Sequence, residues 1–214
     1  MKKIKYSKKS LSNLVFYPYK NTNKYSRGQC CIVAGSHKYP GASILCATSA
    51  QKSGAGYTKL FTDKENVKCI SINYPSIVVE SFSNIHTEYV KKNKPICYVV
   101  GPGFIPDDMS NVTLLKNILS NTDAPVVIDG GAISCLKDTK IQRTIHERSL
   151  KDFITIITPH TGEALSLHPD FNLSKRCKIS QCWRYRTIWH SCRKKHHNLW
   201  WTKSYFLYWK REQY

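Results

Sequence analysis

Apolar runs and stretches of helical spacing alternate along the first three quarters of the chain. The runs are short and bounded by turn residues, which is typical of buried strands. They cover residues 29–34, 57–62, 96–100, 125–128 and 153–157. Helical spacing occurs over 42–53 and over 110–119, with Ser110 as the expected N-cap, and a short helix is expected after residue 157. Strands that alternate with helices predict an α/β fold whose parallel, doubly wound sheet is covered on both faces.

A corner of unusual residues follows most of these strands. The corners are Gly35-Ser36, Gly101-Pro102-Gly103, Asp129-Gly130-Gly131 and Thr158-Pro159-His160. Because ligands of open α/β sheets bind beyond the carboxyl ends of the strands, the corners should converge on one rim. Glycines let backbone amides approach a phosphate, and the helix N-termini that follow favour anions. We therefore expect a nucleotide-type pocket whose rim includes Gly35, Ser36, Gly101, Asp129 and Glu163.

Three polar side chains at these corners each have two interpretations. His160 follows Pro159 at a strand end, so it either reaches a ligand's amide or phosphate or is an exposed loop histidine. Glu163 falls in the first turn of the next helix, where a capping role is the simpler interpretation. Asp129 either binds a hydroxyl or a metal-bound water, or orders its own loop through hydrogen bonds. The sequence leaves all three open, and it shows no Cys/His spacing typical of a zinc site.

Charge divides the chain into three segments. The net charge is +19, and residues 174–214 contain eleven lysines and arginines, one acidic residue and all five tryptophans. So sharp a change in composition marks a boundary. We expect a basic N-terminal segment over 1–27, a partial α/β domain over 28–173 and a foreign tail over 174–214.

The chain shows no feature of a secreted or membrane-spanning protein. It contains no run of about 18 apolar residues, and no apolar core follows the basic N-terminus. We therefore expect a cytoplasmic protein, in which the nine cysteines are mostly reduced thiols. Adjacent Cys30 and Cys31 should point to opposite faces of their strand.

The order of motifs over residues 24–168 resembles that of the NAD(P)H-hydrate dehydratases. The motifs are VAGSHKYPGA, GAG, VVGPGF, VVIDGGAI and ITPHTGEALSL. The TPHxGE segment that follows GPG is the most specific part of the resemblance. The chain departs from the family pattern at Ala34, which replaces the first glycine of GGS, and at Phe104, which replaces leucine. It also departs at Gly130-Gly131 in the aspartate loop and at Thr161, which replaces proline.

This resemblance implies a fold, a reaction and a set of contacts. The fold is ribokinase-like, with three α/β/α layers around a mostly parallel sheet, and is often a homotetramer. The reaction is that of a lyase, which removes water from the S epimer of hydrated NADH or NADPH while ADP or ATP is hydrolysed, with Mg²⁺ expected. The resemblance assigns contacts with the hydrated dinucleotide to Ala42, Gly103 and His160.

Two late motifs of the family are absent from residues 165–214. They are a V-V-x-K-G segment and a GxGD helix start, which supplies amides and an aspartate base for phosphoryl transfer. No catalytic residue is therefore assigned. A reading frame shifted by one nucleotide turns every tryptophan of the tail into glycine, and codon degeneracy allows a V-V-V-K segment. We expect a frameshift between Leu167 and Ile179 and, as a consequence, a chain of low solubility without turnover.

Three other interpretations remain open. A ribokinase-like kinase of a vitamin precursor shares the fold and the glycine-rich rim, but lacks the pairing of GPG with TPHxGE. A nucleic-acid-binding protein would use the basic, tryptophan-rich tail, although its charges follow no helical or alternating pattern. A catalytically inactive remnant is compatible with the dehydratase family.

Overall fold

The computed structural model describes residues 20–89 and 94–167. The strands are β1 (Gln29–Val33), β2 (Tyr57–Thr62), β3 (Val78–Ser81), β4 (Ile96–Val100), β5 (Val126–Ile128) and β6 (Thr155–Ile157). They form a parallel sheet in the order β3-β2-β1-β4-β5-β6. All five strands expected from the sequence are present. Most of the basic N-terminal segment and the whole of the tail over 174–214 lie outside the described residues.

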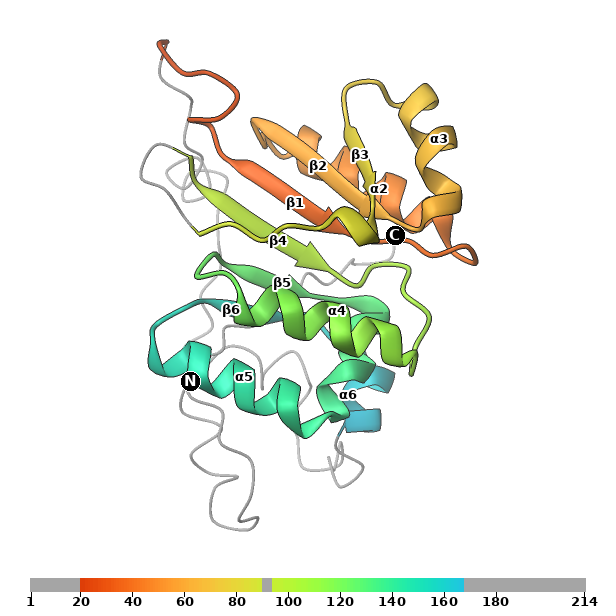
Figure 1. Cartoon of the computed structure of the whole chain (residues 1–214), viewed down its shortest axis with the longest axis vertical. Helices are drawn as coiled ribbons and strands as arrows, with labels where there is room; N and C mark the ends of the chain where they lie inside the picture. Colours follow the sequence, from red (N-terminus) through yellow and green to blue (C-terminus); the bar gives the residue numbers. More distant parts are fainter. Residues whose placement is uncertain (1–19, 90–93, 168–214) are drawn as a thin grey trace, which may run out of the picture.

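Helices cover both faces of this sheet. They are α2 (Pro40–Lys52), α3 (Lys64–Asn73), α4 (Met109–Ser120), α5 (Thr139–Leu150) and α6 (Thr161–Leu167), with short 3₁₀ helices η1 (Phe82–Asn84) and η2 (Gly130–Lys137). Figure 1 shows α2 and α3 beside the β1–β3 half of the sheet and α4 and α5 beside the β4–β6 half. The sequence did not predict β3, α3, η2 or α5.

The alternation of side chains along β1 builds two separate cores. Cys30 and Ile32 pack into one cluster, which includes residues of α2, α3 and β2. Cys31 and Val33 pack into the other, which includes residues of α4, η2 and α5. Successive side chains of a strand point to opposite faces, so β1 supplies both cores at once. This arrangement confirms the three-layer α/β/α architecture and the opposite orientation of the two adjacent cysteines.

Aspartate side chains begin three of the helices. Asp63 accepts a hydrogen bond from the N–H of Glu65 at the start of α3, and Asp138 accepts from Lys140 and Ile141 at the start of α5. Helix α4 begins in the same way at Asp108, whose carboxylate accepts from both the N–H and the hydroxyl of Ser110. The prediction of Ser110 as the N-cap was therefore wrong. An ionised carboxylate satisfies the free N–H groups and meets the positive end of the helix dipole, so Asp108 takes that place.

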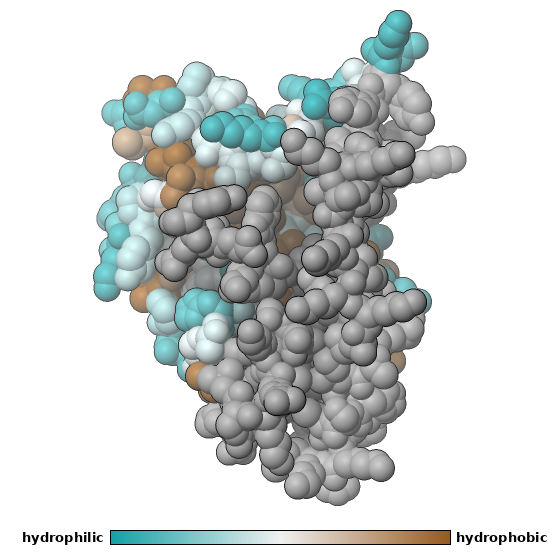
Figure 2. Space-filling view, turned by 180° about the vertical axis from the view of Figure 1, so that it is seen from behind, coloured by the Kyte–Doolittle hydropathy of each residue, from teal (hydrophilic) through white to brown (hydrophobic). Residues whose placement is uncertain are grey.

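Exposed apolar side chains lie outside these cores as well. Figure 2, seen from behind, shows hydrophobic side chains among hydrophilic ones in the part of the view where α2 and α3 lie. Leu45 on α2 and Ile72 on α3 are among the exposed large hydrophobic residues. No helix within residues 20–89 and 94–167 is long and apolar enough to cross a membrane.

Candidate functional site

The chain reverses its direction of winding between β1 and β4, which pair in the middle of the sheet. After β1 it continues into α2 on one face, and after β4 it continues into α4 on the other. The two connecting loops therefore separate at the carboxyl ends of neighbouring strands. Such a switch point is where open α/β sheets bind ligands.

Backbone hydrogen bonds join the corners at this edge. The N–H of Gly35 donates to the carbonyl of Pro102 at 2.7 Å, and the N–H of Gly101 donates to that of Val33 at 2.9 Å. The N–H of Asp129 donates to Val100, and that of Thr158 donates to Ile128, both at 3.0 Å. The corners after β1, β4, β5 and β6 thus form one continuous rim, as the sequence predicts.

Glycine is required where the rim is most crowded. Gly103 has a φ of +76°, and a Cβ built there would lie 2.6 Å from the Cβ of Ala42 and 3.2 Å from the Cα of Gly35. Gly101 has a φ of +111°, and its Cβ would lie 2.1 Å from the carbonyl oxygen of Asp129. L-residues rarely adopt these dihedrals, and no side chain fits there. The structure therefore brings Gly35, Ala42 and Gly103 together.

Asp129 orders the rim. Its carboxylate accepts a hydrogen bond from the hydroxyl of Thr158 at 2.8 Å, which ties the corner after β5 to the corner after β6. The side chain is half-buried. Of its two sequence interpretations, the hydrogen bond to Thr158 corresponds to the ordering of the loop.

His160 and Glu163 form a reciprocal cap at the start of α6. The Nδ1 atom of His160 accepts hydrogen bonds from the N–H groups of Gly162 and Glu163 at 3.0 and 3.3 Å. The carboxylate of Glu163 accepts in turn from the N–H of His160 at 2.7 Å, and its other oxygen lies 3.3 Å from Nε2. Such an exchange is a capping box with a histidine in the place usually taken by serine or threonine.

The cap affects the two side chains differently. Partial burial raises the pKa of the Glu163 carboxyl, and the N–H and imidazole of His160 oppose that rise. The imidazole of His160 remains mostly exposed, with a side-chain exposure of 70%. Its Nδ1 atom accepts from backbone N–H groups and its Nε2 atom faces the Glu163 carboxylate, so both ring nitrogens belong to the cap. The capping interpretation of Glu163 is confirmed, and a ligand contact for His160 stays a prediction.

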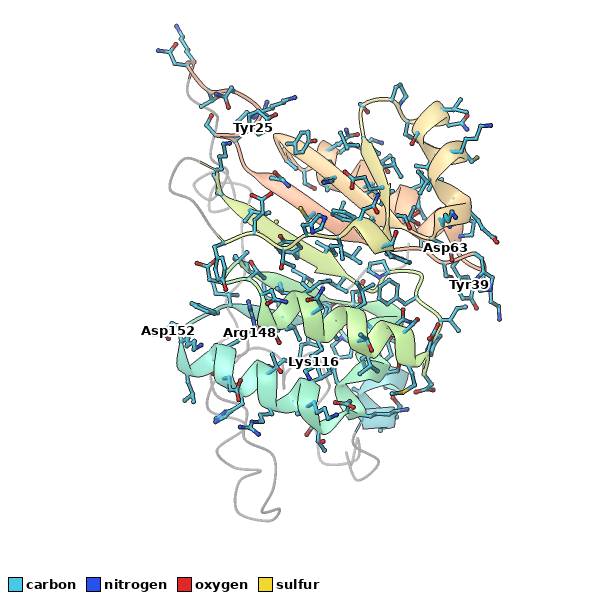
Figure 3. The ribbon with its side chains drawn as sticks, in the orientation of Figure 1. Tyr25, Tyr39, Asp63, Lys116, Arg148 and Asp152 are labelled. Atoms are coloured by element: carbon cyan, nitrogen blue, oxygen red, sulfur yellow. The ribbon has the colours of Figure 1, made fainter. Side chains whose placement is uncertain are left out.

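A cavity of about 340 Å³ opens beside the rim. Its lining residues come from the ends of β1 and β2, from η1 and from the start of α4: Gly35, Ser36, His37, Asp63, Phe82, Ser83, Phe104, Ile105, Asp108, Ser110, Asn111 and Leu114. Figure 3 shows Asp63 at this end of the sheet, close to Tyr39, and Arg148 and Asp152 at the opposite end. Two of the residues expected at the rim, Gly35 and Ser36, line the cavity.

The acidic part of this cavity was not predicted from the sequence. Asp63 directly follows β2, and Asp108 directly precedes α4. The Nδ1 atom of His37 lies 3.8 Å from Oδ2 of Asp63, and the charge of His37 also helps to lower the pKa of Asp108. The Asp63 signal was available, because an aspartate between a strand and a Lys-Glu pair is a typical N-cap. Within the described ranges, no group of three or more histidine, cysteine, aspartate or glutamate residues is arranged to hold a metal ion.

The fold and rim define a class of proteins: ribokinase-like α/β domains with glycine-containing turns at the switch point of the sheet. The profile of the NAD(P)H-hydrate dehydratase family matches residues 30–188, about three quarters of the chain. The chain belongs to this family.

Relatives and solved structures agree with this assignment. A bifunctional NAD(P)H-hydrate repair enzyme Nnr of Thermofilum pendens is 28% identical over 153 residues, which cover 67% of this chain and 28% of that protein. The ADP-dependent (S)-NAD(P)H-hydrate dehydratase of Lactococcus lactis is 29% identical over 145 residues, or 67% of this chain and 50% of that protein. The chain thus spans about half the length of the curated ADP-dependent dehydratases that it matches.

Among solved structures, a dehydratase of similar name has a similar fold. The ADP/ATP-dependent NAD(P)H-hydrate dehydratase of Bacillus subtilis, co-crystallised with ATP and Mg²⁺, superposes with a TM-score of 0.59 at 21% identity. The match covers 76% of this chain and 55% of that one. The similarity confirms the ribokinase-like architecture of the described part.

Proposed function

We propose that this chain binds hydrated NADH or NADPH, as the substrate-binding part of an ADP- or ATP-dependent dehydratase that repairs damaged nicotinamide dinucleotides. The main support is the continuous rim at the switch point, in a chain that belongs to the dehydratase family. Ala42 and Gly103 pack together at a crowded part of this rim, and the largely exposed imidazole of His160 lies at the corner after β6. These are the residues to which the resemblance assigns substrate contacts.

The rim can hold an anionic dinucleotide without a charged side chain. Glycines at positive φ bring the backbone close to the ligand, and the start of α2, which no side chain caps, favours phosphate groups. In the proposed reaction the hydroxyl of the hydrated ring is phosphorylated, and the phosphate is then eliminated. Mg²⁺ would enter with the phosphates of ADP or ATP. Phosphoryl transfer further requires the amides and the base of a GxGD segment, which residues 165–214 do not contain.

A thermal-shift experiment tests substrate binding. We expect (S)-configured hydrated NADH to raise the melting temperature of the 214-residue protein, because a ligand that binds only the folded state stabilises it. A free hydroxymethyl vitamin precursor should have no effect, whereas the reverse result would favour a ribokinase-like kinase. Absence of a shift with the hydrated dinucleotide at millimolar concentration would reject the proposal.

The His160→Asn variant separates binding from folding. Asparagine is a good N-cap, so the variant keeps the start of α6 and removes the imidazole. A smaller thermal shift with hydrated NADH, together with an unchanged melting temperature of the free protein, would establish the ligand contact. His86→Asn is the control, because His86 is exposed and belongs to none of the corners.

Turnover tests the proposal that the tail is out of frame. The absorbance of NADH at its reduced-ring band would follow dehydration in the presence of ADP or ATP and Mg²⁺. We expect no reaction from the chain as written, and nucleotide-driven dehydration would overturn the frameshift. We also propose that the protein is a cytoplasmic homotetramer. Light scattering of the purified chain would measure the number of subunits. A salt-dependent affinity for single-stranded nucleic acid that is lost on deletion of 174–214 would support the rival binding role.

A further inference from the structure

A tight turn before β1, at the amino end of the sheet, carries an exposed tyrosine. The Oδ1 atom of Asn23 accepts hydrogen bonds from the N–H groups of Tyr25 and Ser26 at 2.9 and 3.0 Å. The N–H of Gly28 donates to the carbonyl of Tyr25 at 3.1 Å. An asparagine side chain that bonds to the backbone two residues on fixes such a turn locally. The side chain of Tyr25 is nevertheless 40% exposed, so the turn holds an aromatic ring in place at the surface.

The turn lies directly against the start of β2. A Cβ at Gly56 would lie 2.3 Å from the carbonyl oxygen of Lys24 and 2.6 Å from the Cβ of Arg27, so no larger residue fits there. The N–H groups of Gly56 and Tyr57 both donate to the carbonyl of Gly28, at 3.0 and 3.1 Å. These contacts give the glycine-rich segment before β2 a role, because it fixes the position of the turn.

Two tyrosine rings and three cations meet at this turn. The ring centroids of Tyr25 and Tyr57 are 5.6 Å apart. The Nζ atom of Lys24 lies 5.1 and 5.3 Å from the two centroids, and that of Lys94 lies 5.4 Å from the centroid of Tyr25. Arg27 is exposed on the same turn. We call these five residues the basic tyrosine surface.

The cations of this surface lack acidic partners within the described part of the chain. None of the ion pairs formed there involves Lys24, Arg27 or Lys94. The guanidinium of Arg27 lies 3.5 Å from the carbonyl oxygen of Gly54, which is a neutral acceptor. Positive charges that gather without acidic partners attract an anionic ligand.

The combination of rings and cations restricts the class of ligand. An acidic peptide would use the cations and leave the tyrosine rings without a role. Single-stranded nucleic acid uses both, because its bases stack on aromatic rings and its phosphates pair with lysine and arginine. A cation–π contact at an exposed site is weak, so a base can displace an ammonium group from the ring of Tyr25. The displaced ammonium then pairs with a neighbouring phosphate.

We propose that the basic tyrosine surface binds single-stranded nucleic acid, with one base on the ring of Tyr25 and phosphates at the flanking cations. Such binding depends strongly on salt and little on base sequence. Figure 3 shows Tyr25 at the end of the strands away from Asp63 and Tyr39, which lie near the rim. The inference therefore needs neither the proposed function nor the basic tail.

Fluorescence anisotropy of a labelled oligothymidylate of about 12 nucleotides, titrated with the full-length protein, tests this inference. We expect Tyr25→Ala to weaken binding at least about fivefold, the usual effect of losing one stacking ring. Tyr25→Phe keeps the ring and should keep the affinity. Lys24→Gln and Lys94→Gln should each reduce the slope of log affinity against log salt concentration by about 0.7, the value for one phosphate contact of a single strand.

The matched control is Tyr39→Ala. Tyr39 is 44% exposed, and the Nζ atom of Lys38 lies 5.5 Å from its ring centroid, so a single tyrosine–lysine contact is present near the other end of the sheet. This variant should leave the affinity unchanged. The hydrogen bonds that hold the turn involve the backbone of Tyr25, so Tyr25→Ala keeps the turn, and circular dichroism of each variant checks the fold.

Four results would overturn the inference. The first is an affinity that none of the variants at Tyr25, Lys24 and Lys94 alters, which would assign binding to the tail. The second is an equal loss in Tyr25→Ala and Tyr39→Ala. The third is a duplex of the same length, or a polyglutamate of the same charge, that binds as tightly as the single strand. The fourth is the absence of binding at low ionic strength.

Discussion

The two ends of the sheet differ in what supplements their backbone hydrogen bonds. At the carboxyl end, the corners bond to one another through N–H and carbonyl groups, and glycines at positive φ allow the close approach. At the amino end backbone groups also pair, for example from Gln29 to Pro95 and from Val126 to Ile154. A buried side chain is added there: the guanidinium of Arg148 donates to the carbonyls of Leu119, Thr122 and Ala124. Figure 3 shows Arg148 towards the left and Asp63 towards the right of the view, at opposite ends of the strands.

This difference separates an edge supported by a buried side chain from an edge with a cavity beside it. Arg148 is only 3% exposed, and it also donates to the hydroxyl of Thr155 in β6. Its side chain fills the space between α5, the loop after α4 and β6. At the carboxyl edge, backbone hydrogen bonds join the corners, and a cavity of about 340 Å³ lies beside them.

The largest expected effect concerns the crowded corner at Gly101. Gly101→Ala places a Cβ 2.1 Å from the carbonyl oxygen of Asp129 and 2.3 Å from the Cβ of Ala132, at a φ of +111°. Because backbone must move, we expect a loss of about 4 kcal/mol in the free energy of unfolding. Urea denaturation followed by circular dichroism measures it.

Gly41→Ala is the control for this substitution. A Cβ at Gly41 meets nothing within 4 Å, and the residue lies in the first turn of α2. Alanine there should change the free energy of unfolding by less than about 1 kcal/mol. If Gly101→Ala is equally mild, the rim is not a rigid backbone assembly, and the contrast between the two edges fails.

The strands and corners could be predicted because their signals are local. A short apolar run followed by glycine identifies β1 or β4 without knowledge of the rest of the chain, and the rule for parallel sheets then brings the corners together. Helix α3 gives a weak signal, since Ile70 is its single buried residue. Neither η2 nor α5 was predicted, although α5 begins at Asp138 in a regular cap.

The candidate site was harder to predict than the fold. Its acidic part consists of Asp63 and Asp108, which are 45 residues apart in the sequence. They line the same cavity only because of the order of the strands in the sheet. Serine is a common N-cap, so the sequence predicts Ser110 as the cap of α4, whereas the aspartate two residues earlier holds that place. The capping exchange between His160 and Glu163 could be read from the TPHTGE segment, since its spacing is that of a capping box.

The second prediction concerns the amino edge. Arg148→Met keeps much of the buried volume but leaves the carbonyls of Leu119, Thr122 and Ala124 without their donor. Unsatisfied buried acceptors cost about 1 kcal/mol each or more, so we expect a loss of about 3 kcal/mol. Arg148→Lys should recover a minor part of the lost free energy of unfolding, because one ammonium group cannot reach all three carbonyl acceptors. Chemical denaturation of the three proteins gives the order.

An exposed arginine on the same helix provides the comparison. Arg143 forms an ion pair with Glu147 at 3.0 Å, and its side chain is 82% exposed. An exposed pair of this kind is worth about 0.5 kcal/mol, so Arg143→Met should have little effect. A large loss at Arg143 together with a small one at Arg148 would contradict the assignment of the amino edge to a buried guanidinium.

The smallest expected effect distinguishes the cap of α6 from the rest of the carboxyl edge. The pKa of Glu163 is raised in the folded protein, so the folded state holds its proton more tightly than the unfolded state does. The contribution of this group to stability is therefore fully present below the pKa of the unfolded chain and is lost as pH rises through the folded pKa. Glu163→Gln abolishes this dependence and keeps an acceptor for the N–H of His160.

Urea denaturation at pH 4 and at pH 7 measures this effect as a difference between the unchanged protein and the variant. On lowering the pH, the unchanged protein should gain about 0.5 kcal/mol relative to Glu163→Gln, since the side chain is only partly buried and solvent weakens the effect. A gain of the opposite sign would mean that the His160 contacts outweigh burial, so that the cap stabilises the carboxylate and resembles the polar network at the amino edge.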